Sequence, residues 1–276
     1  MAAWSGIWRN SVSASDLGHD MNQDKQVERD RYDAQAKELL SGLGDTQMTD
    51  TFGSHGIPPS LRSPYIFYEQ RIREMIRPQD RVLELAAGAG MHTSALLQTG
   101  AHVTATDISP HSLKLLEQRI HGARGSLTTH VADMEKLPFS DGAFDVVACA
   151  GGLSYGDPSL VDDEIRRVLR QDGALICVDS LNHNPIYRLN RWVHYRRGER
   201  TRSTLQRMPD LARISALGSG FADVNVRYFG AFSYAMPAIA SLFGEAKAQV
   251  VSDRLDELIG AKRSAFKFVL VAQGLR

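Results

Sequence analysis

The feature that most constrains the fold is a series of short apolar runs in the middle of the chain. They alternate with stretches of helical periodicity that begin at typical capping pairs, Ser109 before Pro110 and Asp157 before Pro158. Apolar strands separated by helices are typical of a parallel sheet that helices cover on both faces. We predict strands at residues 82–85, 103–106, 127–131, 146–150 and 175–178, with Gly173 ending the helix before the last of them.

The last third of the chain has a different pattern. Strands are predicted at 224–229 and 266–271, where they would complete one edge of the sheet as a hairpin-like pair around residues 230–262. Helical spacing of apolar residues is found at 24–40, 64–76 and 211–217. The sequence therefore predicts a Rossmann-like α/β domain at 65–276, with a seven-stranded, mostly parallel sheet and helices on both faces. Residues 1–64 would form an N-terminal helical cap, and 183–222 a lid-like insertion after the fifth strand.

Composition excludes several classes of protein. With 32 Lys and Arg against 32 Asp and Glu, no overall charge attracts the chain to nucleic acid or to an anionic membrane. The two cysteines, Cys149 and Cys177, lie in predicted strands and lack the spacing of a metal site or a disulfide framework. No apolar run approaches the length of a membrane span, and residues 1–13 do not resemble a cleavable leader. We expect a cytoplasmic protein with no metal.

A turn rich in small residues comes after the first predicted strand. Residues 82–90 read VLELAAGAG and precede a helix predicted at 92–97. Small residues allow the backbone to approach a ligand closely, and glycine adopts conformations that other residues avoid. Any tight strand-to-helix turn can have this composition, so the motif alone does not distinguish a binding turn from a purely structural one.

The next two strands end in acidic residues that suit a nucleoside. Asp107 ends the second strand, at about the distance expected for a carboxylate that binds both ribose hydroxyls. A helix-capping role is the alternative for Asp107, although Ser109 is better placed to cap. Asp133 ends the third strand, where it could accept a hydrogen bond from an adenine amino group while Met134 packs beside the ring. Their alternative is a polar turn with a core methionine.

With these motifs in this order, residues 65–182 resemble the class I S-adenosylmethionine-dependent methyltransferases, in particular the small-molecule branch that includes quinone methyltransferases. The resemblance implies S-adenosylmethionine as cofactor, with the methionine part near the first turn, ribose at Asp107, adenine at Asp133 and the methyl group beside residues 150–153. The implied cofactor-binding residues are Glu84, Ala86, Gly88, Gly90, Asp107, Ile108, Asp133, Met134, Ala150 and Leu153.

Two departures from familiar patterns bear on this interpretation. Ala86 stands where the resembled family often has its first glycine, which is a mild change. No glycine lies near Thr93, where a nicotinamide-binding fold would need one for close packing of helix and strand. The second departure disfavours a nicotinamide-dependent oxidoreductase.

The acceptor site is expected at the carboxyl ends of the fourth and fifth strands, around residues 151–155 and 179–183. His183 is our candidate for the general base because histidine titrates near neutral pH. His55 and Tyr155 are the other candidates. A loop histidine can equally be polar or structural without any catalytic role.

Residues 187–207 combine arginines with aromatic residues. Such a segment could cover an anionic acceptor, because guanidinium groups bind phosphate or carboxylate and aromatic faces stack on rings. The alternative is a solvated helix whose arginines pair with nearby acids. The residues concerned are Arg188, Arg191, Arg196, Arg197, Arg200, Arg202 and Arg207, with Tyr187, Trp192 and Tyr195 between them.

We therefore predict methyl transfer from S-adenosylmethionine to a small-molecule or saccharide acceptor, most favourably at oxygen. The balanced charge argues against a nucleic acid acceptor. Two other functions stay open: a regulatory protein that binds S-adenosylmethionine without catalysis, and a nicotinamide-dependent oxidoreductase.

Overall fold

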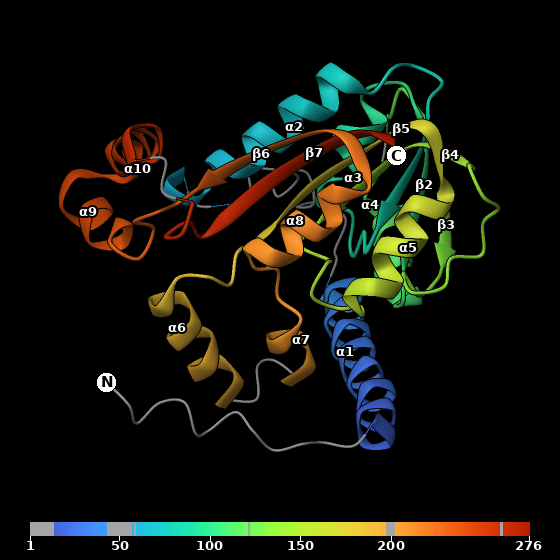
Figure 1. Cartoon of the computed structure of the whole chain (residues 1–276), viewed down its shortest axis with the longest axis horizontal. Coiled ribbons are helices and arrows are strands. Elements are labelled where there is room, and N and C mark those ends of the chain that lie inside the picture. The colour runs from blue at the N-terminus through green and yellow to red at the C-terminus, as the bar shows by residue number, and fades with distance from the viewer. Residues whose placement is uncertain (1–13, 43–56, 58, 121, 197–201, 260–261) are drawn as a thin grey trace.

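The computed structural model describes residues 14–42, 57, 59–120, 122–196, 202–259 and 262–276. Its centre is one seven-stranded sheet in the order β3-β2-β1-β4-β5-β7-β6 (Figure 1). The strands are β1 (Arg81–Leu85), β2 (His102–Asp107), β3 (Ser126–Val131), β4 (Phe144–Ala150), β5 (Leu169–Ser180), β6 (Phe221–Phe229) and β7 (Lys267–Leu275). The predicted seven-stranded Rossmann-like sheet is confirmed.

Strand direction agrees with the predicted division of the chain. The strands from β1 to β5 pair in parallel, whereas β7 is antiparallel to both β5 and β6. The edge pair is therefore present, with β7 inserted between β5 and β6. The order of the parallel strands reverses between β1 and β4, and ligands in such sheets bind beside the carboxyl ends of the strands at this switch point.

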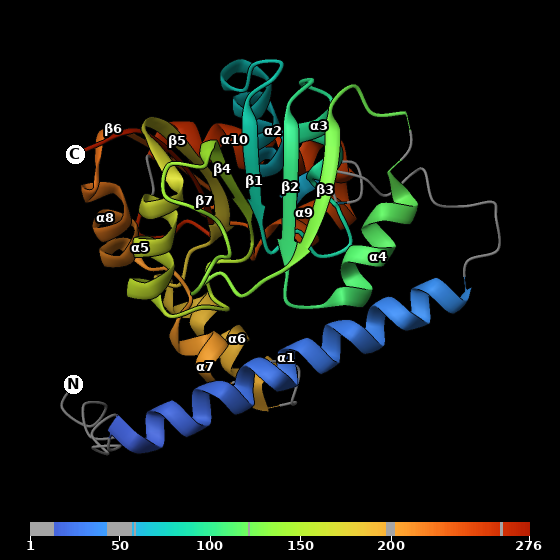
Figure 2. The same cartoon turned by 90° about the vertical axis from the view of Figure 1, so that its right-hand side faces the viewer.

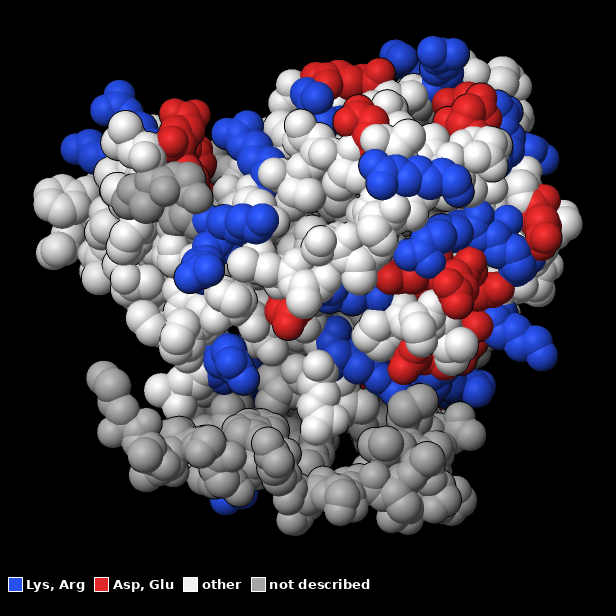
Figure 3. Space-filling view, viewed as in Figure 1, with Lys and Arg blue, Asp and Glu red and all other residues white. Residues whose placement is uncertain are grey.

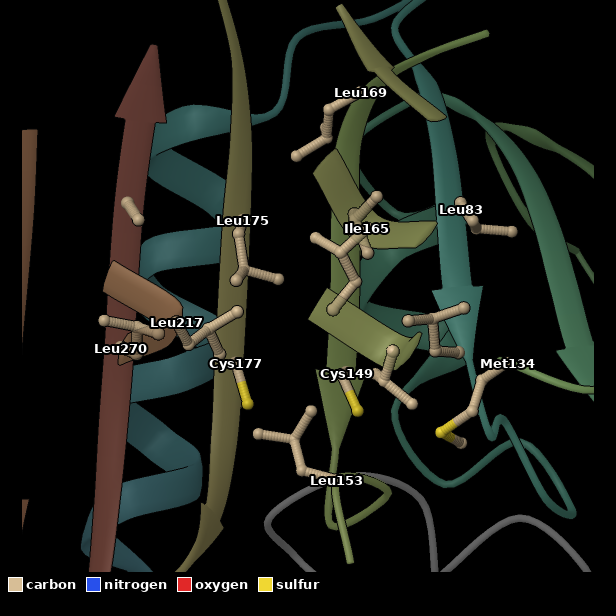
Figure 4. Close-up of a cluster of buried hydrophobic side chains, with 14 of the residues drawn as sticks. Leu83, Met134, Cys149, Leu153, Ile165, Leu169, Leu175, Cys177, Leu217 and Leu270 are labelled. Carbon is tan, nitrogen blue, oxygen red and sulfur yellow. The ribbon is translucent and has the colours of Figure 1, made fainter. Parts of the chain in front are cut away.

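Helices cover both faces of the sheet. Tyr68 and Ile72 of α2 pack on one face together with Leu96 of α3, and Ile165 of α5 and Leu217 of α8 pack on the other (Figure 4). The helices are α1 (Ala14–Gly42), α2 (Ser63–Met75), α3 (Thr93–Leu97), α4 (Pro110–Arg119), α5 (Pro158–Val168), α6 (Pro185–Arg196), α7 (Arg202–Gln206), α8 (Leu211–Ser219), α9 (Met236–Phe243) and α10 (Glu245–Ile259), with a 3-10 turn at Pro59–Leu61.

The sheet core explains where the cysteines lie. Cys149 on β4 and Cys177 on β5 are fully buried and face each other across the paired strands (Figure 4). Both are free thiols. They fill the core as small apolar side chains.

One predicted boundary was wrong. Gly173 does not end a helix: α5 ends at Val168, and β5 begins directly at Leu169, six residues before the predicted strand. A Cβ on Gly173 would lie 3.1 Å from the Asp145 carbonyl oxygen of the neighbouring chain segment. The nearest atom to such a Cβ would be the Arg170 carbonyl oxygen of the same strand, at 2.9 Å, and the pairing register between β4 and β5 shifts around Gly173. The glycine therefore permits a tight irregularity at the start of β5, which sequence periodicity does not show.

Helix α1 lies apart from the two layers. It extends past the carboxyl ends of the strands, beside α4 and close to α7 (Figure 2). It begins ten residues before the predicted helix at 24–40. Among the residues that the structure describes, no helix combines the length and the apolar character needed to cross a membrane.

The surface agrees with the balanced composition. On the face shown in Figure 3, acidic and basic side chains are interspersed over the sheet domain. Among the described residues on that face, no large surface of one sign is present.

The N-cap of α5 tests whether the predicted capping by Asp157 stabilises the protein. The Asp157 carboxylate accepts hydrogen bonds from the amides of Ser159 and Leu160, at 2.9 and 3.3 Å. We expect Asp157→Ala to lower the free energy of unfolding by about 1 kcal/mol, measured by urea denaturation at neutral pH. Asp157→Asn keeps a capping oxygen and is the matched control; equal losses in both variants would contradict the capping role.

Candidate functional site

A pocket opens at the switch point of the sheet. Its cavity volume is about 150 Å³, and its mouth is open to solvent. Loops after four strands form one side, and α1 forms the other. The lining residues are Lys25, Glu28, Tyr32, Ala86, Gly88, Thr106, Asp107, Ile108, Ala132, Asp133, Met134, Ala150, Gly151 and Tyr155.

The turn after β1 has an unusual backbone. Ala86, Gly88 and Gly90 all have positive φ, at 51°, 53° and 83°. At Gly90, a Cβ would also lie 2.8 Å from the Cγ of Leu116 on α4. Glycine is therefore required at Gly90 by both conformation and packing. Ala86 adopts a conformation that favours glycine, which is the residue often found there in the resembled family.

Asp107 connects two turns of the pocket. Its carboxylate accepts hydrogen bonds from the amides of Gly88, at 2.9 Å, and Ser109, at 2.8 Å. Burial raises the pKa of Asp107, and these hydrogen bonds oppose the shift. Ser109 is the N-cap of α4 and accepts from the Ser112 amide, so Asp107 does not have the capping role that was its alternative.

Asp133 lies where β3 ends and is already held from two directions. Its Oδ1 accepts from the Glu135 amide at 3.0 Å, and its Oδ2 is 2.6 Å from the Lys25 ammonium on α1. The same ammonium is 2.5 Å from Oε2 of Glu135. Met134 is buried beside these groups and lines the pocket.

Three predicted cofactor residues do not line this pocket. Glu84 is buried under the turn and accepts a hydrogen bond from the Thr93 hydroxyl at 2.6 Å. Leu153 is buried in the core, and its amide donates to Asp179 at 2.9 Å. Gly90 packs against α4. These residues support the loops around the pocket, and any direct contact with a cofactor stays a prediction.

Sequence reasoning predicted an N-terminal helical cap but missed the side chains that α1 contributes to the pocket. Lys25, Glu28 and Tyr32 project from one side of this helix into the pocket. The Tyr32 hydroxyl is 2.5 Å from that of Tyr155, and Glu28 accepts from Thr204 of α7 at 3.0 Å. The spacing of Lys25, Glu28 and Tyr32 in the sequence fits one face of a helix. The spacing does not show which strand ends that face covers.

The candidate bases lie in different places. His183 is half-buried in the loop after β5 and does not line the pocket, so its role stays a prediction. Tyr155 lines the pocket; its burial, together with the nearby Tyr32, raises the pKa of its phenol well above the usual value. Tyr155 is therefore a hydrogen-bond donor at neutral pH. His55 lies outside the described residues.

The arginine-rich segment does not form a single surface. Arg191 is buried and donates to the Leu181 carbonyl oxygen at 2.8 Å, while Arg188 and Arg196 are exposed on α6. Arg207 donates to the Tyr155 carbonyl oxygen at 3.4 Å, which connects the segment to the pocket. Arg197, Arg200 and the side chain of Arg202 lie outside the described parts of the chain. Binding of an anionic acceptor here stays a prediction.

Comparisons with known proteins agree with this geometry. Residues 83–177 match the model of a methyltransferase domain. A demethylmenaquinone methyltransferase of Clavibacter sepedonicus is 39% identical over 111 residues, which cover 40% of this chain and 45% of the relative. The chain thus spans about two fifths of the length of the curated relatives that it matches.

Two solved structures share the fold over most of this chain. A geranyl diphosphate C-methyltransferase of Streptomyces coelicolor superposes with a TM-score of 0.55 and 17% identity, covering 78% of this chain and 80% of the other. The [4+2]-cyclase SpnF has a TM-score of 0.57 and 18% identity, covering 91% and 96%. At these identities the likeness shows the fold alone.

The buried Glu84 carboxyl under the turn after β1 should make the stability of the protein depend on pH. Burial raises the pKa of Glu84 to about 8, from an ordinary value of 4.5. Between these values the folded protein binds a proton that the unfolded chain has released, so stability falls as the pH rises through the folded-state pKa. We expect the unfolding free energy of the wild type to decrease from about pH 5 to about pH 9, and the neutral Glu84→Gln to show a smaller decrease.

Urea denaturation across this range measures the effect. Glu257→Gln, a change at an exposed carboxyl on α10, is the control and should match the wild type. An identical pH dependence in wild type and Glu84→Gln would show that Glu84 is not the titrating group.

Proposed function

We propose that this chain is a class I S-adenosylmethionine-dependent methyltransferase. It transfers a methyl group from that cofactor to a small-molecule or saccharide acceptor, most favourably at oxygen. The observation that supports this most directly is the convergence of the motifs. Seven of the ten residues expected at the cofactor line one pocket: Ala86, Gly88, Asp107, Ile108, Asp133, Met134 and Ala150.

The pocket fits the chemistry of the cofactor. Asp107 offers carboxylate oxygens for the ribose hydroxyls, and Met134 offers an apolar surface for adenine beside Asp133. The turn at Gly88 leaves open space, because a Cβ there would contact nothing within 4 Å. When bound, S-adenosylmethionine supplies a methyl group already activated by a sulfonium centre. The protein then has to orient the acceptor, exclude water and accept a proton from a hydroxyl acceptor.

The acceptor is proposed to enter beside the loops after β4 and β5. Tyr155 would orient an acceptor oxygen by donating a hydrogen bond, since its raised pKa keeps the phenol protonated. His183 is the proposed proton acceptor. The helices between β5 and β6, residues 183–222, are proposed to cover the acceptor, and Arg207 already connects them to Tyr155.

The fold alone does not decide between methyl transfer and the two alternatives. The likeness to a [4+2]-cyclase shows that this fold is found in a protein named for a reaction other than methyl transfer. Binding of the cofactor without methyl transfer would favour the non-catalytic alternative. The oxidoreductase alternative requires nicotinamide binding, which the turn at Thr93 disfavours because it lacks the third glycine.

The cofactor is tested by calorimetric titration of the purified protein with S-adenosylhomocysteine, with NAD as the control ligand. We expect saturable binding of S-adenosylhomocysteine and none of NAD, because Asp107 and the turn suit an adenosine without the fingerprint of a dinucleotide site. Binding of NAD alone would overturn the proposal.

The ribose contact is tested by Asp107→Ala. Loss of the carboxylate should weaken S-adenosylhomocysteine binding by about 1.5 to 3 kcal/mol, since hydrogen bonds to a charged group are lost. Asp223→Ala, at an exposed position on β6, is the control. Unchanged affinity in a folded Asp107→Ala protein would remove Asp107 from the ribose site.

A further inference from the structure

Helix α1 is joined to the domain mainly by polar contacts. Among its described side chains, the one buried apolar residue is Ala36, while Val27 and Leu39 are 51% and 42% exposed. A helix that only packed on the core would bury an apolar stripe. The contacts of α1 therefore suggest a different purpose.

These contacts meet the pocket at three separate places. Lys25 binds Asp133 and Glu135 after β3, and Tyr32 meets Tyr155 after β4. The Asp33 carboxylate accepts a hydrogen bond from the Ser109 hydroxyl after β2 and is 3.2 Å from Nδ1 of His111. Glu28 of the same helix also lines the pocket between these points.

Each contact partner lies at or beside a residue proposed to bind the cofactor. Asp133 is the proposed adenine acceptor itself, and Ser109 donates its amide to Asp107. Tyr155 lies after Ala150 in the loop that leaves β4. Helix α1 thus lies past the carboxyl ends of the strands that bear these residues (Figure 2), although it lies outside the matched domain at 83–177.

We propose that α1 is a working part of the cofactor site, in which Lys25 positions the Asp133 carboxylate and the helix must move away for cofactor to enter and product to leave. This inference rests on the proposed function. Opening exposes little apolar surface, because Ala36 is the buried apolar contact among the described residues. It breaks ionic contacts that are partly accessible to solvent, with side-chain exposures of 20% for Lys25 and 11% for Glu135. On opening, these groups regain water, which offsets part of the contact energy that is lost.

Ligand binding and helix closure are then thermodynamically linked. A ligand that contacts the closed form better than the open form shifts α1 toward closure, and closure slows ligand release by the same coupling. Lys25 is a positioning residue in this scheme, because it acts through Asp133 and Glu135.

The test compares variants of the full chain in calorimetric affinity for S-adenosylhomocysteine and in its dissociation rate, measured by displacement with excess unlabelled ligand. We expect Lys25→Met to weaken binding about tenfold, mainly through faster dissociation, since one charge-assisted contact is lost. Lys25→Arg keeps the charge and should restore most of the affinity. Lys37→Met, at an exposed position of the same helix, should match the wild type.

Tyr32→Phe removes a single oxygen and tests the second contact even if Lys25→Met fails to fold. It should raise the dissociation rate by a few-fold. Hydrogen exchange gives an independent measurement: amides of residues 25–36 should become more protected when S-adenosylhomocysteine binds the wild type.

Three results are decisive. Wild-type affinity and dissociation rate in Tyr32→Phe and in a folded Lys25→Met, with unchanged exchange in α1, would overturn this role of the helix while leaving the proposed function intact. If Lys25→Met loses affinity for S-adenosylhomocysteine and Lys25→Arg does not restore that affinity, the positioning role is also rejected. A wild-type protein that does not bind S-adenosylhomocysteine would overturn both proposals.

Discussion

The pocket depends on the way one buried carboxylate holds two turns together. Asp107 accepts amide hydrogens from Gly88, after β1, and from Ser109, at the start of α4. Parallel strands end at the same edge of the sheet, so their loops must be arranged without any hairpin to connect them. A carboxylate with several acceptor positions can hold both loops and still offer an oxygen to a ligand. The same side chain therefore supports both the local structure and the proposed binding.

Small residues around Asp107 make that arrangement possible. The positive φ angles at Ala86, Gly88 and Gly90 turn the chain sharply, and α4 packs so closely on Gly90 that no side chain fits there. Ala86 shows that the turn tolerates one alanine in this backbone region. The buried Glu84 below it, bound by Thr93, anchors the start of α3 to β1. The backbone geometry is thus maintained from below by Glu84 and from the side by Asp107.

The side of the pocket that α1 forms is held in place by polar contacts. The strand ends supply small residues and the carboxylates of Asp107 and Asp133. Helix α1 supplies Lys25, Glu28 and Tyr32, which bind by charge and hydrogen bonds. Polar contacts of this kind fix the orientation of a helix without the large apolar burial that would make it permanent. A rigid floor with a polar cover is an arrangement that can hold a cofactor during reaction and release it afterwards.

The sequence by itself determined the strands and the motif residues, because their periodicity and turn chemistry are local. The apolar runs predicted the five parallel strands, and Ser109 and Asp157 cap helices as their sequence positions indicated. The order of Ala86, Gly88, Asp107 and Asp133 predicted a common site, and these residues do line one pocket. Only the tertiary structure decided that Gly173 lies within β5, where it meets Asp145, and that α1 covers the strand ends. Both depend on contacts between segments far apart in the chain: Lys25 and Asp133 are 108 residues apart, and no local pattern encodes their meeting.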